Sequence, residues 1–123
     1  MPIRLVVTGG RDFTDGDAVF YVLDRVHRDR GVSVLIHGAA KGADSLAAAW
    51  ARDRGVPVEP YPVTDWKFPD GSTDRSAGPR RNARMLARGK PDACVAFAGG
   101  SGTAGMVRLC EAADVPVWRI GWG

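Results

Sequence analysis

The 123-residue sequence is poor in the residues that usually build disulfides, metal centres or membrane spans. Its two cysteines, Cys94 and Cys110, lie outside any CxxC or metal-like spacing, so we expect reduced, buried thiols. The two histidines form no metal pattern with them, and neither a metal nor a cofactor is expected. No apolar run approaches the roughly 20 residues that span a bilayer, and no leader-like segment opens the chain. We therefore expect a cytoplasmic protein without membrane contacts.

The sequence also lacks a large excess of either positive or negative residues. The net charge is +3 with 25% charged and 45% hydrophobic residues, a mixture typical of a folded domain. The length suits one domain over residues 1–123. A mildly basic balance is weak support for nucleic-acid binding and fits a small anionic ligand equally well.

What the sequence has is an unbroken alternation of short apolar runs and helical patterns. Runs rich in β-branched residues predict five strands, at 3–7, 32–36, 56–61, 92–97 and 115–120. Segments with helical spacing predict helices before Gly31, before Gly55, over 79–88 and over 103–113. This alternation predicts an α/β fold: a Rossmann-like open parallel sheet of about five strands, in order 3-2-1-4-5, with helices on both faces. The prolines of the third strand place it at an edge.

One stretch departs from this pattern. Residues 63–77 are polar and show no period, which predicts a long loop of the kind that often forms a lid or a binding surface. Trp66 in this loop could stack on a base or simply anchor the loop.

The sequence contains 16 glycines, many of them clustered where a predicted strand ends. Because the carboxyl ends of parallel strands share one rim, these clusters should converge there. The run Gly99-Gly100-Ser101-Gly102-Thr103 precedes a helix, so its backbone N–H groups could bind phosphate, with Thr103 capping the helix or contacting the phosphate. A plain turn is the alternative. The run lacks the six-residue Walker spacing that ends in lysine, which disfavours a nucleoside-triphosphatase loop.

Three further segments carry candidate ligand contacts at this rim. Gly9 and Gly10 precede Arg11, a forked donor for phosphate or carboxylate, whose alternative is a solvated arginine paired with Asp12. The second segment offers Gly38, Lys41, Gly42 and Asp44, and the third offers Arg80, Arg81, Asn82 and Met85. Asp44 could cap its helix or accept from a ribose hydroxyl.

In the third segment, arginines at a helix start oppose the helix dipole, which a bound anion would offset. Pairing with Asp70 or Asp74 is the alternative.

Four motifs in this order resemble the YspA, YpsA-related branch of the SLOG superfamily. They are VTGGRDF (7–13), HGAAKGAD (37–44), AGPRRNARM (77–85) and FAGGSGT (97–103). The resemblance implies a Rossmann-like fold and binding of a nucleotide or nucleotide-derived ligand. It also implies kinship with the LOG phosphoribohydrolases and the DNA-processing protein A family, which binds single-stranded DNA, and suggests a homo-oligomer.

The LOG enzymes carry an Arg-x-x-x-Met motif, matched by Arg81 and Met85, and a Gly-Gly-x-Gly-Thr-x-x-Glu motif. Met106 stands where the second motif has its catalytic glutamate, and methionine performs no acid–base chemistry. Either another carboxylate, such as Asp44 or Asp65, has this role, or the protein binds without cleaving.

We favour binding or sensing of a phosphorylated nucleotide-like ligand. The alternative is an N-glycosidase acting on a nucleoside monophosphate or dinucleotide. Single-stranded nucleic-acid binding through Arg80, Arg84 and Arg88 is a weaker alternative.

Overall fold

The structure, a computed structural model, describes residues 1–122. These residues form five strands, β1 (Ile3–Thr8), β2 (Val32–His37), β3 (Val58–Pro60), β4 (Ala93–Phe97) and β5 (Val117–Ile120). They also form four helices, α1 (Gly16–Arg30), α2 (Ala43–Arg54), α3 (Ala77–Gly89) and α4 (Ser101–Ala112). The strands make one parallel sheet in the order β3-β2-β1-β4-β5, as predicted.

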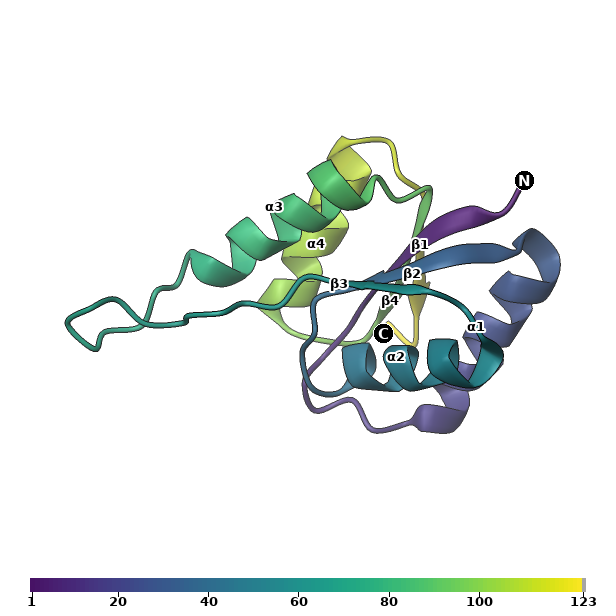
Figure 1. Cartoon of the computed structure of the whole chain (residues 1–123), viewed down its shortest axis with the longest axis horizontal. Helices are drawn as coiled ribbons and strands as arrows, with labels where there is room; N and C mark the ends of the chain where they lie inside the picture. Colours follow the sequence, from purple (N-terminus) through teal and green to yellow (C-terminus); the bar gives the residue numbers. More distant parts are fainter. Residues whose placement is uncertain (123) are drawn as a thin grey trace.

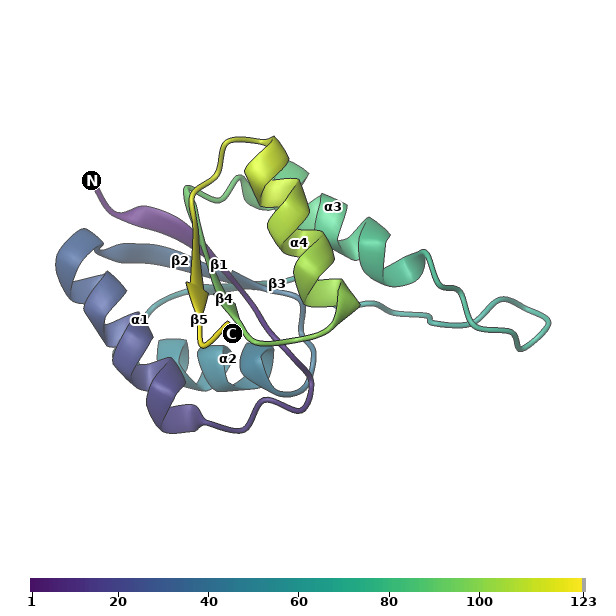
Figure 2. The ribbon, with the colours of Figure 1, turned by 180° about the vertical axis from the view of Figure 1, so that it is seen from behind.

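Helices cover both faces of the sheet (Figures 1 and 2). On one face, α1 and α2 pack over a core that includes Leu5, Leu35, Trp50 and Phe97. On the other, α3 and α4 pack over Val6, Ile36, Met85 and Met106. Alternate residues of β1 therefore serve opposite cores, which explains why its sequence is apolar throughout.

Both cysteines are buried as free thiols, as expected. None of the helices within residues 1–122 combines the length and apolarity needed to cross a bilayer.

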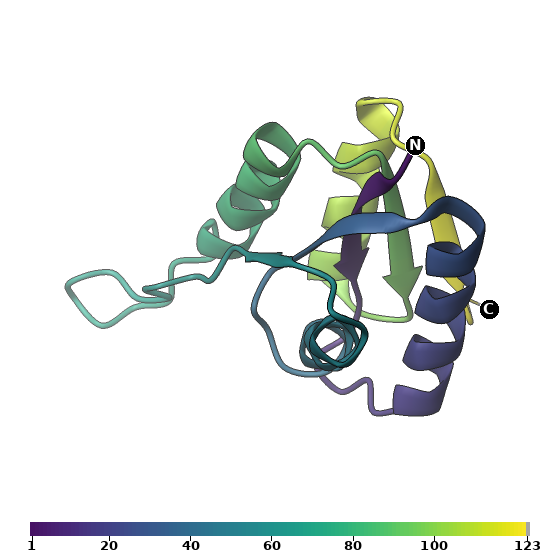
Figure 3. The same ribbon diagram turned by 45° about the vertical axis from the view of Figure 1, so that its right-hand side comes forward.

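The segment between β3 and α3 is more ordered than the predicted loop. It forms a hairpin-like arm that projects well away from the sheet (Figure 3). An antiparallel bridge joins Lys67 to Thr73, and backbone bonds run from Phe68 N–H to Ser72 O and from Asp74 N–H to Trp66 O. The two sides of the arm are too short to show the alternation of apolar and polar residues by which paired strands are predicted from sequence.

Two helices begin two residues earlier than predicted. Helix α3 begins at Ala77 and α4 at Ser101. Pro79 still lies in the first turn of α3, where its missing N–H leaves no gap in the hydrogen-bond ladder. The earlier start of α4 places Gly102 and Thr103 inside its first turn.

Candidate functional site

The glycine-rich segments meet at the carboxyl ends of β1 and β4 and close the floor of the site. Gly10 N–H donates to Ala98 O at 2.9 Å, and Ala43 N–H donates to Gly10 O at 3.2 Å. Space is tight: a Cβ on Gly99 would lie 2.7 Å from Gly10 N, and a Cβ on Gly42 would lie 2.6 Å from Arg11 O. Gly42 also has φ +76°, which favours glycine. These glycines allow the close approach of two turns.

A cavity of about 1000 Å³ lies above this floor. That volume is at the upper end for small-molecule sites. Its walls come from the ends of β1 and α2, the base of the arm, and the facing sides of α3 and α4. Among the predicted residues, the lining includes Gly9, Arg11, Asp44, Arg81, Asn82, Met85, Gly100, Ser101, Gly102 and Thr103.

The first turn of α4 presents unpaired N–H groups to this cavity. Gly100 is the N-cap residue and supplies no side-chain bond, and the turn holds no acidic residue. Within residues 1–122, the N–H groups of Ser101, Gly102 and Thr103 donate to no protein acceptor. The predicted cap by Thr103 is wrong, because this residue lies inside the helix and is buried. An open helix N-terminus carries partial positive charge and suits an anion.

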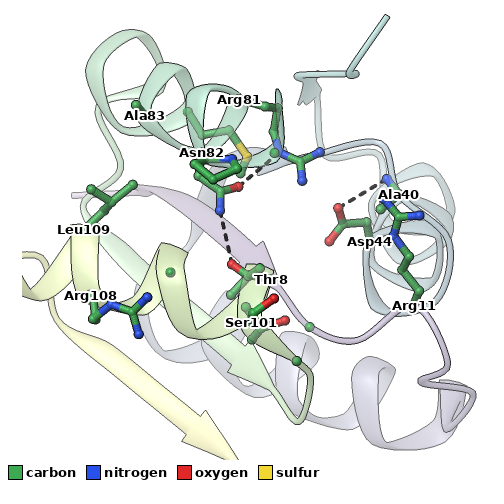
Figure 4. A pocket seen from close by; sticks show the side chains of 18 of the residues that line it. Thr8, Arg11, Ala40, Asp44, Arg81, Asn82, Ala83, Ser101, Arg108 and Leu109 are labelled. Carbon is green, nitrogen blue, oxygen red and sulfur yellow. Dashed lines mark hydrogen bonds between the residues drawn. The ribbon is translucent and has the colours of Figure 1, made fainter. Parts of the chain in front are cut away.

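Helix α3 supplies Arg81 and Asn82 on the wall beside this turn (Figure 4). Arg81 donates to Gly38 O at 2.6 Å and through Nε to Asn82 Oδ1 at 3.0 Å. Asn82 in turn donates to Gly102 O at 3.1 Å. This chain of bonds ties the start of α3 to the loop after β2 and to the first turn of α4. Burial lowers the pKa of Arg81, although a guanidinium stays charged at neutral pH.

Asp44 is the buried carboxylate of the site. It is 6% exposed, and its Oδ2 accepts from Gly38 N–H at 3.0 Å and Ala40 N–H at 3.3 Å. Burial raises its pKa from 3.8 to about 6, opposed by these backbone bonds and by the charges of Arg81 and Arg11. The expectation that Asp44 caps its own helix is wrong, because it bonds the preceding loop instead.

Trp66 brings the base of the arm to the cavity, and the guanidinium of Arg11 lies 5.0 Å from its ring centroid. Arg11 thus stacks on Trp66 and forms no ion pair with Asp12 within residues 1–122. Lys41 and Gly38 line an adjoining hollow that Arg11 and Arg81 also border.

Arg80 points away from the cavity and pairs with Asp74 at 2.8 Å, the alternative raised from the sequence. The structure also adds Thr8, Arg75 and Arg108 to the lining. Arg108 follows Ser101 and Gly105 at helical spacing, so its position on the cavity face of α4 was readable from the sequence. Residues 1–122 contain no cluster of three or more His, Cys, Asp or Glu placed to hold a metal.

Comparison with known proteins supports the motif assignment. The sequence pattern of the YspA, cpYpsA-related SLOG family matches residues 3–67, which include the first two motifs. The chain is 35% identical over 125 residues to the Gene 61 protein of Mycobacterium phage D29, covering 96% of each.

Among solved structures, DNA processing protein A (DprA) from Streptococcus pneumoniae superposes with a TM-score of 0.74 at 18% identity. The match covers 100% of this chain but 51% of the DprA chain, and it shows a shared Rossmann-like fold.

Proposed function

We propose that this chain, which belongs to the YspA, cpYpsA-related SLOG family, binds a nucleotide or nucleotide-derived phosphorylated ligand in the cavity at the sheet rim. One observation carries the proposal. An uncapped helix N-terminus, four arginine side chains and a buried carboxylate line the same cavity of about 1000 Å³. Donors for an anion and an acceptor for hydroxyl or N–H groups are what a phosphorylated nucleoside requires.

The first turn of α4 is the proposed phosphate site. Cβ atoms placed on Gly100 and Gly102 would meet nothing within 4 Å, so the space above this turn is open. A phosphate there accepts from the free N–H groups of Ser101, Gly102 and Thr103, while Arg81 and Arg11 supply positive charge from the facing wall.

Trp66 is the proposed stacking surface for the base. Trp66 is 37% exposed, and the guanidinium of Arg11 already lies at cation–π distance from its ring. A base that stacks here would leave Arg11 near enough to contact the attached sugar or phosphate.

N-glycosidic cleavage is a second candidate, favoured by the position of Asp44. Met106 stands where the LOG motif has its catalytic glutamate, and it is fully buried between the sheet and α4. That position therefore supplies no carboxylate to the cavity. Asp65 lies outside the cavity lining, with its carboxylate bonded to Lys67 N–H. Asp44 is thus the buried carboxylate available to assist loss of a base. Release of free base from a nucleoside monophosphate, abolished by Asp44→Asn, would support this activity.

The binding proposal is tested with a panel of nucleotides in thermal-shift assays, followed by calorimetry of those that raise the melting temperature. We expect micromolar binding of at least one nucleotide, lost in Arg81→Gln. Arg80→Gln is the matched control, because the neighbouring guanidinium faces Asp74. Absence of any shift across the panel, or equal loss in both variants, would contradict the proposal.

A further inference from the structure

Asp44 has one carboxylate oxygen that the protein fixes and one that it leaves open. Oδ2 accepts from the backbone of Gly38 and Ala40, which sets the orientation of the side chain. Oδ1 makes no hydrogen bond within residues 1–122, yet it is not sealed from solvent. Figure 4 shows the carboxyl group turned toward the cavity, across from Thr8 and Ser101. The open oxygen is therefore a preformed acceptor for a ligand.

The surroundings select the kind of donor that this oxygen accepts from. Arg81 and Arg11 act on Asp44 through space, and neither forms an ion pair with it within the described chain. Their two positive charges would repel a metal ion or an ammonium group from the same place. A neutral donor escapes this repulsion and gains a hydrogen bond to an ionised acceptor.

The order of groups along a nucleotide identifies that donor. In the proposed binding mode, phosphate lies at the first turn of α4 and the base lies on Trp66. The sugar joins the two, and it carries the neutral hydroxyl donors of the ligand. We propose that Asp44 binds the vicinal hydroxyls of a ribose and makes the site selective for ribonucleotides. This inference rests on the proposed nucleotide binding.

Selectivity for ribose should follow from the cost of leaving Asp44 Oδ1 without a hydrogen-bond donor. A hydrogen bond to a charged group is worth about 10- to 100-fold in affinity. A sugar without hydroxyls leaves Oδ1 buried under the ligand with no partner. The wild-type protein should therefore bind a ribonucleotide about 10- to 100-fold more tightly than its 2′,3′-dideoxy counterpart.

The test is calorimetry with the four common ribonucleoside 5′-monophosphates and their 2′,3′-dideoxy counterparts. Asp44→Asn keeps an acceptor for the Gly38 and Ala40 N–H groups but removes the charge, so it should reduce the ribose preference to within about threefold. Glu111→Gln, which removes an exposed carboxylate paired with Arg119, should keep the full preference.

The outcomes separate the two proposals. If wild-type protein binds ribo- and dideoxynucleotides equally, the role of Asp44 is refuted while nucleotide binding stands. If Asp44→Asn changes the preference among bases and not among sugars, the carboxylate contacts the base and the ribose assignment is overturned. If no nucleotide of either kind binds, the proposed function itself fails.

Discussion

Gly102→Glu separates ligand binding from folding more cleanly than truncation of any side chain. Gly102 lies in the first turn of α4, is exposed, and has open space at its Cβ position. A glutamate there replaces a poor helix former and places negative charge at the positive end of the helix. The two effects contribute about 0.5–1 and 0.3–1 kcal/mol. We therefore expect the free energy of unfolding to rise by about 1 kcal/mol, and the melting temperature by about 3–6 °C.

The same carboxylate should repel a phosphate bound at this turn. Two unit charges about 5 Å apart at an effective dielectric constant of about 20 repel by about 3 kcal/mol, a loss of about a hundredfold in affinity. Gly102→Ala is the control, because it keeps the helix benefit without the charge. Its affinity should fall by less than about tenfold.

Thermal unfolding measures the stability of each variant, and calorimetry of the same samples measures its affinity for the ligand. A more stable Gly102→Glu protein that no longer binds is the expected result. A variant that is more stable and binds as tightly as Gly102→Ala would refute the placement of phosphate at α4.

Three further predictions concern the floor and walls of the site. Gly42→Ala should lower the free energy of unfolding by about 3 kcal/mol or more, because Gly42 has a positive φ and its Cβ position lies against the backbone of Gly10 and Arg11. Gly71→Ala is the control, because Gly71 has φ +88° but lies in open space on the arm, and it should lower the free energy of unfolding by about 1 kcal/mol. Equal losses for the two variants in chemical denaturation would contradict the tight packing at Gly42. Burial raises the pKa of Asp44 to about 6, so the folded state loses stability as pH rises from about 4 to about 6. Asp44→Asn should therefore raise the free energy of unfolding by about 1–3 kcal/mol at pH 7.5 and leave it unchanged below pH 4. A difference in stability between variant and wild type that does not change with pH would count against a buried charge at Asp44. Arg81→Ala should destabilise the protein more than Arg80→Ala in urea melts, since Arg81 is half-buried and bonds the Gly38 carbonyl, whereas the Arg80 side chain is exposed.

The sheet order could be predicted from the sequence because each strand is apolar and the strands alternate with helices. Parallel strands joined by right-handed crossovers leave few arrangements open. The rim followed from the same rule, which put the glycine clusters at one end of the sheet. The register of the strands and the first residues of α3 and α4 could not be predicted from the sequence. They depend on packing between α3 and α4 and on the bond from Asn82 to Gly102.

Side-chain partners in the site were harder to foresee than its location. Whether Arg80 or Arg81 faced the cavity depended on the rotation of α3, and this rotation is set by burial of Met85 against β1 and β2. Asp44 looked like a helix cap because its position in sequence fits one. The positive φ of Ala39, at 57°, bends the loop so that Gly38 and Ala40 donate to Asp44 instead. Such a bend cannot be predicted from the composition or the periodicity of the sequence.

The most direct test of nucleotide binding at the rim is a backbone-amide NMR titration of the intact protein with 5′-nucleotides. We predict that the largest shifts fall on Ser101, Gly102 and Thr103, whose N–H groups are open, with smaller shifts near Asp44. Shifts confined to the exposed arginines of α3, or no shifts at millimolar nucleotide, would contradict the account.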